Sequence, residues 1–237
     1  MGTGPRTIAV FGAGPALGMA VARRFGQEGF RVALVARDQA RLATLAGQLT
    51  AEGIQATAFP ADLADREEAL RVTREIQAGL GPVDVLEYSP GGDSTLRRNP
   101  SQVEVPAAEA VLGKFVLTPI SLVRQVLPGM VDRGDGALLV ALGASAKYPM
   151  PQLAGGGMAL AALRNYILAL HTELAPAGVY AGALLIGALI EGSAAHRNAS
   201  AWGGGRAVGT VTAADLAGRY WDMYTRRDRA EEEVIRF

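Results

Sequence analysis

The chain of 237 residues contains no cysteine. This absence excludes a disulfide framework, a thiolate metal site and a cysteine nucleophile. The only two histidines, His171 and His196, do not stand in an H-E-x-x-H or comparable metal-binding spacing. A G-x-S-x-G nucleophile elbow and a G-K-S/T phosphate-binding turn are also missing. The sequence therefore predicts no metal site and none of the common nucleophile-based hydrolase centres.

An excess of charge of either sign is also missing, because 23 Lys and Arg residues balance 23 Asp and Glu residues. Nothing in this balance favours binding to nucleic acid or to an anionic membrane. The longest nearly apolar run, residues 179–190, is short and broken by glycine, and the N-terminus shows no secretory signal pattern. We therefore expect a soluble cytoplasmic protein.

Linker-like stretches are absent as well, so we expect one domain over residues 1–237. Hydrophobic residues make up 49% of the chain and charged residues 19%, which is ample for a sizeable core. Short apolar runs alternate with longer amphipathic stretches, which is typical of an α/β fold with a parallel sheet.

A glycine-rich stretch near the N-terminus is the strongest local signal. Residues 8–11 form an apolar run typical of a buried strand, and the sequence Gly12-Ala13-Gly14-Pro15-Ala16-Leu17-Gly18 follows it directly. In a nucleotide-binding turn one glycine allows a sharp bend, a second lets backbone approach a pyrophosphate, and a third lets the helix pack closely on the strand. The predicted cofactor-binding residues of this turn are Gly12, Gly14, Ala16, Leu17 and Gly18.

A second apolar run, residues 31–36, completes a strand–helix–strand unit and ends at Arg37. An acidic residue at this place binds the ribose 2′-hydroxyl of NAD(H), whereas an arginine accommodates the 2′-phosphate of NADP(H). Arg37 therefore favours NADP(H) over NAD(H). The alternative is that Arg37 only opens the polar helix predicted for residues 38–52.

The remaining pattern continues the alternation of strands and helices. Asp65 is the better N-cap of the helix at residues 66–80, although Asp62 could serve, and Thr212 is expected to cap the helix at 213–225. Pro119 should kink the long helix at 107–130 or mark its first turn. Further strands are expected at 55–60, 83–88, 137–142, 179–190 and, as an edge strand, 233–237.

The order and spacing of GAGPALG, the strand ending in Arg37, ADLAD, VDVLEYSPGG and GALLVALGAS resemble the short-chain dehydrogenase/reductase family over nearly the whole chain. The resemblance implies a Rossmann-type doubly wound parallel sheet in three α/β/α layers. It implies that Asp62 contacts the adenine and that Leu63 packs on the adenine ring. It also implies that the segment matching the family's N-N-A-G and the backbone after its Pro-Gly pair line the cofactor, here Ser89, Pro90 and Gly91, and Gly187 and Leu189.

The family's four catalytic side chains are missing from the matching positions. Gly143 stands at the serine, Gly156 at the tyrosine, Leu160 at the lysine and Ala110 at the asparagine. No Y-x-x-x-K pattern occurs anywhere in the chain, although residues four apart on a helix must face the cofactor together for that chemistry. Carbonyl reduction by the usual tetrad is therefore not expected.

Three other hydroxyl groups are candidate catalytic groups. Ser145 lies two residues past the serine position, about 7 Å along the chain if the strand continues. Tyr148 follows Lys147, whose charge would lower a tyrosine pKa, and Tyr88 ends a strand near the expected nicotinamide. The alternatives are that Tyr148 is a packed loop aromatic and Tyr88 a strand-end residue with a satisfied hydroxyl.

The C-terminal third suggests a lid and a subunit contact. Residues 192–211 are rich in small residues around Trp202 and match the family's substrate lid. The aromatic run at residues 220–224 suggests packing against a second subunit, as a homodimer or homotetramer.

The sequence thus favours an NADP(H)-dependent oxidoreductase with a non-standard proton donor and a small-molecule substrate. A non-redox enzyme on the same scaffold (isomerase, cyclase or dehydratase) and a catalytically inactive NADP(H)-sensing protein remain alternatives.

Overall fold

The fold is a seven-stranded parallel sheet in the strand order β3-β2-β1-β4-β5-β6-β9. It is seen in a computed structural model that describes residues 4–91, 97–198 and 208–236. The strands are β1 (Thr7–Phe11), β2 (Arg31–Ala36), β3 (Ala56–Pro60), β4 (Val83–Tyr88), β5 (Gly136–Gly143), β6 (Val179–Gly187) and β9 (Glu231–Ile235). A small second sheet pairs β7 (Leu189–Ile190) with β8 (Thr210–Val211).

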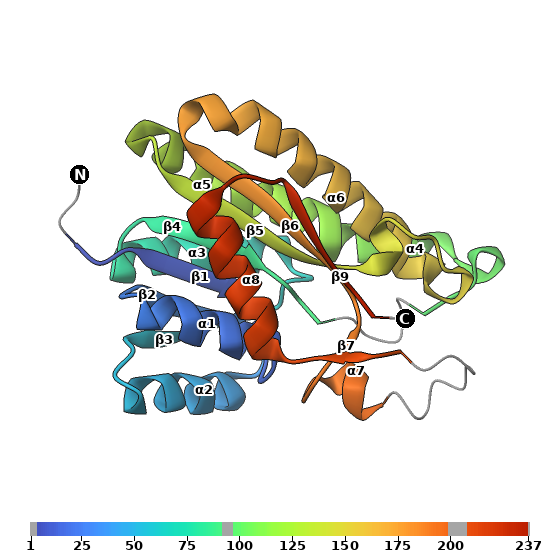
Figure 1. Cartoon of the computed structure of the whole chain (residues 1–237), viewed down its shortest axis with the longest axis horizontal. Helices are drawn as coiled ribbons and strands as arrows, with labels where there is room; N and C mark the ends of the chain where they lie inside the picture. The colour runs from blue at the N-terminus through green and yellow to red at the C-terminus, as the bar shows by residue number, and fades with distance from the viewer. Residues whose placement is uncertain (1–3, 92–96, 199–207, 237) are drawn as a thin grey trace.

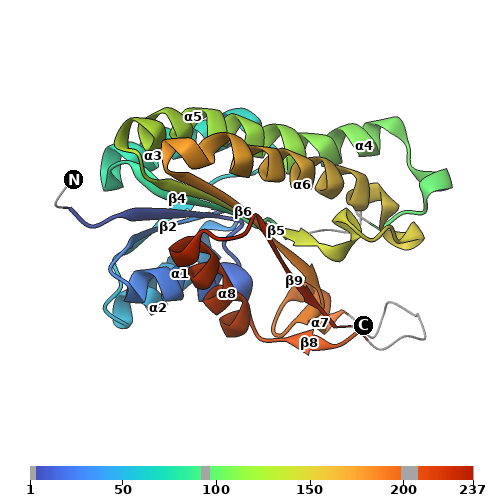
Figure 2. The same cartoon turned by 45° about the horizontal axis from the view of Figure 1, so that its top comes forward.

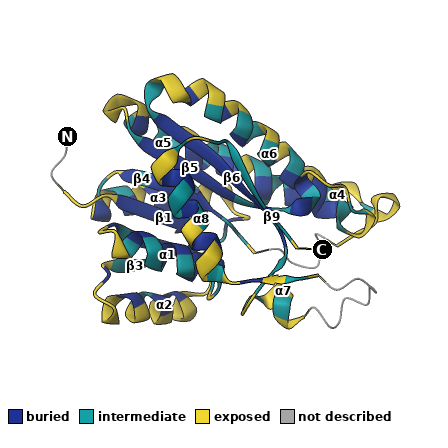
Figure 3. Cartoon of the chain, viewed as in Figure 1, coloured by how far each residue is buried: buried dark blue, intermediate teal, exposed yellow. Residues whose placement is uncertain are grey.

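Helices cover both faces of the large sheet (Figures 1 and 2). One face carries α1 (Leu17–Gln27), α2 (Gln39–Ala51) and α8 (Ala213–Arg226), and the other carries α3 (Arg66–Leu80), α5 (Thr118–Arg133) and α6 (Ala154–Leu174). The short helices are α4 (Val105–Leu112) and α7 (Ala194–Arg197). Central strands are buried on both faces, as Figure 3 shows, so their sequences are continuously apolar rather than alternating. This is the Rossmann-type α/β/α arrangement expected from the sequence.

Most element boundaries follow from local signals in the sequence. The Asp65 carboxylate accepts a hydrogen bond from the Glu68 N–H at 3.1 Å, and the Thr212 hydroxyl accepts one from the Asp215 N–H at 3.1 Å. These N-caps fix the starts of α3 and α8 where the sequence predicted them. The predicted long strand at 179–190 is instead split into β6 and β7.

The predicted long helix at 107–130 is also divided. A π-helical turn, Gly113–Leu117, separates α4 from α5, and Pro119 lies in the first turn of α5. Pro119 has no N–H to donate to a carbonyl of the preceding turn. The π-helical turn lies at the place where this hydrogen bond is missing. Of the two predicted roles for Pro119, the structure shows the first-turn position.

Two helical stretches, Val105–Arg133 and Pro151–Ala177, are long and apolar enough to cross a membrane. Neither stretch is an uninterrupted apolar run, so the sequence alone did not indicate them. Both stretches include helices that pack on one face of the sheet (Figure 2), and core helices of soluble proteins have the same length and composition.

The aromatic end of α8 packs inside its own chain. Tyr220, Met223 and Tyr224 are buried, and the Trp221 and Tyr224 rings lie 5.1 Å and 5.4 Å from the Phe25 ring of α1. Contacts with α1 therefore account for the burial of these side chains, so the aromatic run is not by itself a sign of a second subunit. Self-association as a homodimer or homotetramer stays a prediction without this support.

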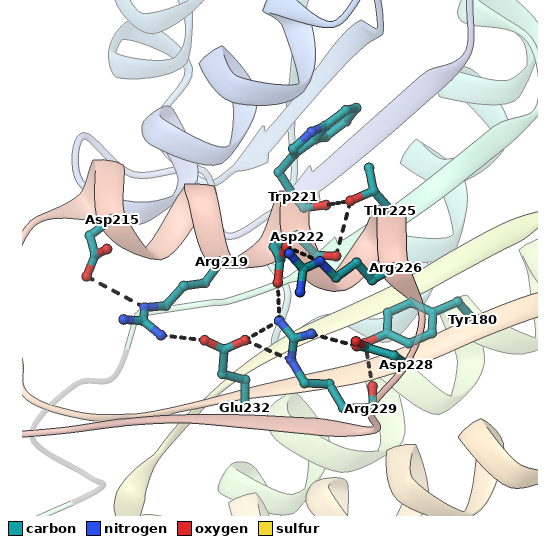
Figure 4. A network of polar contacts seen from close by, with 10 residues as sticks. All are labelled: Tyr180, Asp215, Arg219, Trp221, Asp222, Thr225, Arg226, Asp228, Arg229 and Glu232. Atoms are coloured by element: carbon teal, nitrogen blue, oxygen red, sulfur yellow. Dashed lines mark hydrogen bonds and ion pairs between the residues drawn. The ribbon is translucent and has the colours of Figure 1, made fainter.

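Ion pairs on both faces of the edge strand β9 join its glutamates to the rest of the fold. Glu232 faces α8 and accepts hydrogen bonds from Arg219 and Arg229, and Arg229 also bonds Asp222 at 2.5 Å (Figure 4). Alternate residues of a strand point to opposite faces, so the flanking glutamates, Glu231 and Glu233, turn toward the α6 side. Three consecutive glutamates can thus form a strand because each of them has a cationic partner.

Candidate cofactor and active site

The glycine turn after β1 has a backbone that only glycine permits. Gly12 has φ +103°, and a Cβ there would lie 2.6 Å from the backbone of Ser89 and Pro90. The N–H groups of Gly12 and Ala13 both donate to Val35 O, at 2.9 and 3.0 Å. The turn is therefore clamped between the ends of β2 and β4, at the carboxyl edge of the sheet where doubly wound folds bind ligands.

The other two glycines of the turn differ in their surroundings. A Cβ on Gly18 would lie 2.8 Å from the Cα of Ala13, so Gly18 lets α1 pack on the turn. Gly14 is open, since the nearest atom to its Cβ position is Gly12 O at 3.9 Å. Helix α1 begins without a side-chain cap or an acidic residue in its first turn. Its N–H groups are thus available to an anion such as a pyrophosphate.

A cavity of about 190 Å³ lies at the carboxyl ends of β2 and β3. Its lining residues are Arg37, Pro60, Ala61, Asp62 and Glu68. Arg37 is exposed and makes no ion pair with any residue that the structure describes. The sequence predicted that Arg37 and Asp62 serve the same cofactor, and the structure brings them to one cavity. An unpaired guanidinium at its edge fits a phosphate.

Two predicted cofactor contacts compete with contacts inside the chain. Leu63 is 4% exposed and packs in the core on the α3–α5–α6 side of the sheet, so its side chain offers little surface to an adenine ring. The Leu189 N–H donates to Gly209 O at 3.0 Å in the pairing of β7 with β8, so it is not available to a nicotinamide carboxamide. The family resemblance implied both contacts. The sequence alone did not indicate that the core would cover Leu63 or that Gly209 would accept the Leu189 hydrogen bond. Gly187 ends β6 and is buried.

The end of β4 passes directly under the glycine turn. The Ser89 N–H donates to Phe11 O at 2.9 Å, and the Pro90 backbone touches Gly12. Gly91 O accepts a hydrogen bond from Lys114 Nζ at 3.2 Å. The π-helical turn brings Lys114 to this rim. Lys114 was not among the expected site residues, and its one signal in the sequence is that the chain has just two lysines.

Two of the positions that match the family's catalytic side chains, Gly143 and Leu160, lie next to each other. A Cβ on Gly143 would lie 3.6 Å from Leu160 Cδ1 and 3.7 Å from Ser145 Oγ. A Cβ on Gly157, next to Gly156, would lie 3.6 Å from the same Oγ. The backbone of the active centre is thus present, while the serine and lysine positions hold a glycine and a leucine. Ser145 supplies the hydroxyl group in this cluster.

Ser145 is closer to the centre than the sequence indicated. The expected displacement of about 7 Å assumed that β5 continues, but residues Ala144–Ala146 form a 3-10 turn. The turn folds Ser145 back beside Gly143 and the first turn of α6. The Ser145 side chain is half-buried beside Gly143 and Gly157, and no hydrogen bond joins its hydroxyl to another described residue, so it is available to a substrate.

Tyr148 lies in a different environment from the one expected. Its hydroxyl donates to Glu233 Oε2 at 2.8 Å, and this hydrogen bond raises the pKa of Tyr148. Lys147 does not reverse that direction, because its ammonium group binds both Glu231 and Glu233. The structure therefore contradicts the prediction that Lys147 prepares Tyr148 as an acid or base.

Tyr88 is a core residue. Its side chain is 1% exposed, and its hydroxyl donates to Lys114 O at 2.5 Å. Burial is the main cause of a raised Tyr88 pKa. The geometry favours the structural role weighed for Tyr88 and does not support a proton-donor role. The half-buried His171 ring of α6 lies against β6, with its Nδ1 2.8 Å from Ala181 O.

The substrate lid expected at residues 192–211 lies partly outside the described residues, and Trp202 is among those not described. The described part contains α7 and β8, and β8 pairs with β7 just before the segment. Within the described ranges no group of three His, Asp or Glu side chains is placed to bind a metal ion.

Comparison with known proteins assigns the family. The family model of the short chain dehydrogenases matches residues 6–201. The chain belongs to the short-chain dehydrogenase family. It is 31% identical over 183 residues to the short chain dehydrogenase MYCFIDRAFT_6125 of Pseudocercospora fijiensis, covering 76% of this chain and 58% of that relative. This dehydrogenase chain therefore spans little more than half the length of that curated relative.

Solved structures share the fold over nearly the whole chain. L-Sorbose reductase from Gluconobacter frateurii, in complex with NADPH and L-sorbose, has a TM-score of 0.86 at 21% identity, covering 99% of this chain and 97% of that one. An NADPH-bound short chain oxidoreductase of Pseudomonas aeruginosa PAO1 "containing an atypical catalytic center" has a TM-score of 0.82 at 23% identity, covering 97% and 95%. At these identities the likeness shows the short-chain dehydrogenase fold and no more.

Proposed function

We propose that this protein is an NADP(H)-dependent oxidoreductase that acts on a small molecule without the family's catalytic tetrad. The observation that carries the proposal is the glycine turn clamped against Pro90, together with the Arg37–Asp62 cavity at the ends of β2 and β3. The uncapped N-terminus of α1 and the open Gly14 fit the pyrophosphate, and the unpaired Arg37 fits a 2′-phosphate. Solved relatives of this fold, described as NADPH complexes, support the cofactor.

The chain's own residues define the chemistry that remains. NADPH, when bound, supplies a hydride. The Ser145 hydroxyl can donate a hydrogen bond to a substrate oxygen or nitrogen, and Leu160 leaves the lysine position without a charge. A substrate that is already cationic, such as an iminium, or a proton supplied by water, suits such a centre. The P. aeruginosa structure described as having an atypical catalytic centre supports a family member of this type.

The test is oxidation of NADPH by the purified protein with panels of imines, carbonyl compounds and enones. We expect turnover that is strongest with preformed iminium ions and depends on NADPH consumption. Failure across all three panels, with NADPH binding intact, would contradict the oxidoreductase proposal.

The empty tetrad positions favour a second candidate, a protein that binds NADP(H) without turning it over or that performs non-redox chemistry beside it. Glycine at 143 and 156 and leucine at 160 cannot exchange protons. Product formation that persists with a redox-inactive cofactor analogue would identify the non-redox enzyme. Binding without any turnover would identify the sensor.

A further inference from the structure

Glu87 is a completely buried carboxyl group that the cofactor site as described does not explain. It lies in β4 with 0% exposure, paired in register with Val10 of β1 and Leu139 of β5. Both partners belong to the core on the α1–α8 side of the sheet, so Glu87 points into that core. Glu87 was not among the site residues expected from the sequence, although an acidic residue in a strand buried on both faces is a visible signal.

Two other polar groups are buried on the same side of the sheet. Ser89 follows Glu87 by two residues and so faces the same way, and Tyr220 enters from α8. Within the described part of the chain, both Glu87 carboxyl oxygens, Ser89 Oγ and Tyr220 Oη lack a hydrogen-bond partner. Buried polar atoms without partners are costly unless they bind one another, and both Ser89 and Tyr220 are close enough to Glu87 to interact with it.

The surroundings favour the neutral form of Glu87. The buried residues of α1 are all apolar or glycine, and no Lys or Arg of the described residues pairs with the carboxyl group. Facing titratable groups are Tyr220 of α8 and, behind it, Tyr180 of β6, which donates to Arg229 O at 2.8 Å. Burial raises the pKa of Glu87 to about 8, and the nearby Ser89 hydroxyl offsets part of the rise. The Glu87 charge, in turn, raises the pKa of Tyr220 beyond the effect of burial.

We propose that Glu87 is a positioning residue of the cofactor site, which as a neutral acid joins Ser89 to Tyr220 and holds the end of β4 beneath the glycine turn. The carboxyl O–H donates to Ser89 Oγ, and the Tyr220 O–H donates to the carboxyl carbonyl oxygen. The inference rests on the proposed function only for its ligand.

The link to the cofactor is direct because Ser89 and Pro90 form the surface on which Gly12 rests. Loss of the proton leaves a charge in an apolar core, which the fold relieves by opening around it. Opening at Ser89 shifts Pro90 and with it the clamp on Gly12. The glycine turn should therefore loosen as Glu87 ionises, while the distant start of β4 stays closed.

The first experiment needs no cofactor. Hydrogen exchange is measured on peptides that contain the glycine turn and the end of β4, for wild type and Glu87→Gln at about pH 6.5 and pH 9. The variant is neutral at both values, so comparison at equal pH removes the intrinsic rise of exchange with pH. We expect equal protection at the lower pH and faster exchange in the wild type at the higher pH. Equal protection at both values would overturn the proposal.

Asp84→Asn is the matched control, since Asp84 is a half-buried acid at the opposite end of β4 that binds Arg133 at 3.3 Å and the Thr7 N–H. It should not change exchange at the glycine turn. If Glu87→Gln fails to fold, Tyr220→Phe serves instead. This substitution removes a hydrogen-bond donor that stabilises the Glu87 carboxylate, so it should raise the Glu87 pKa and move the onset of fast exchange to higher pH.

The pH dependence of the free energy of unfolding, measured without cofactor, is an independent test of whether Glu87 titrates. The folded pKa of Glu87, about 8, lies above its ordinary value of 4.5, so its contribution is fully present below pH 4.5 and is lost as pH rises through 8. Wild-type stability relative to Glu87→Gln should therefore fall between these values. A difference that does not change with pH would show that Glu87 does not titrate in the fold.

The second experiment separates this proposal from the proposed function. The Kd for NADPH is measured between pH 7 and 9 for both proteins, and the wild-type Kd should rise about tenfold relative to Glu87→Gln, following the loss of the neutral form. A parallel pH dependence in both proteins would contradict the positioning role. If NADPH binds neither protein, the cofactor proposal fails, whereas the exchange experiment still decides the role of Glu87.

Discussion

The two halves of the sheet's carboxyl edge differ in what their function requires. The cofactor half, at the ends of β1 to β4, works through backbone: a positive φ at Gly12, a close contact with Pro90 and a bare helix start. The catalytic half, at the end of β5 and the start of α6, works in the family through side chains, and here the positions hold Gly143, Gly156 and Leu160. Backbone geometry is tied to the fold, so it persists, whereas reactive side chains can be lost without moving the chain.

The largest expected effect comes from breaking the backbone requirement of the cofactor half. Gly12→Ala puts a Cβ at 2.6 Å from the backbone of Ser89 and Pro90 and strains a φ of +103°. We expect destabilisation of about 2–5 kcal/mol and loss of cofactor binding. Chemical denaturation and calorimetric titration with NADPH measure the two effects.

Gly14→Ala is the matched control. Its Cβ has no neighbour closer than 3.9 Å and its φ is not positive, so the fold should keep its stability. Only cofactor affinity should fall, because the methyl group occupies the open side of the turn. Equal destabilisation by both substitutions would show that the turn is not clamped as described.

The next effect concerns the charge that distinguishes the two cofactors. Arg37→Ala should weaken NADPH binding by about 10- to 150-fold, the equivalent of a charge-assisted contact of about 1.5–3 kcal/mol, and leave NADH binding nearly unchanged. Calorimetric titration with each cofactor measures this. Arg41→Ala is the control, since Arg41 is an exposed neighbour that pairs only with Asp38 at 3.7 Å. A wild type that prefers NADH would contradict the placement of the 2′-phosphate at Arg37.

The same contrast explains which expectations from the sequence were correct. Strand β2, helix α3 and the caps Asp65 and Thr212 follow from signals a few residues long, and the structure shows them where the sequence placed them. The grouping of Arg37 with Asp62 follows from the rule that parallel strands end at one edge. Local patterns and sheet topology thus suffice to bring Arg37 and Asp62 together.

Expectations that depended on distant partners were the ones that failed. Lys147 is adjacent to Tyr148 in sequence, yet both bind glutamates of β9 more than 80 residues away. The aromatic residues of α8, which were expected to cover a second subunit, contact Phe25 of α1 in the same chain. Neither contact has a local signal, because the sequence does not say which edge strand carries the opposing charge or which helix covers α8.

Ser145 offers a sharper test of the catalytic half. If its hydroxyl binds the substrate, Ser145→Ala should lower kcat/KM about 2- to 12-fold, the equivalent of one net hydrogen bond of about 0.5–1.5 kcal/mol. NADPH affinity should not change, because Ser145 lies beside Gly143 and α6 rather than at the glycine turn. Ser121→Ala is a control, since Ser121 bonds only the Leu117 carbonyl of its own helix. An unchanged kcat/KM would leave the centre without a protein hydroxyl.

The smallest effect is expected at Tyr148, where the sequence and the structure disagree most directly. Tyr148→Phe removes the hydrogen bond to Glu233 and leaves the ammonium group of Lys147 between Glu231 and Glu233. Because that hydrogen bond raises the Tyr148 pKa, the hydroxyl stays protonated at neutral pH and is not prepared to act as a base. We therefore expect kcat and its pH profile to match the wild type within error, which steady-state rates between pH 6 and 10 measure. Loss of an alkaline limb from the wild-type profile would restore Tyr148 as a catalytic group and would mean that β9 moves away from it in the working enzyme.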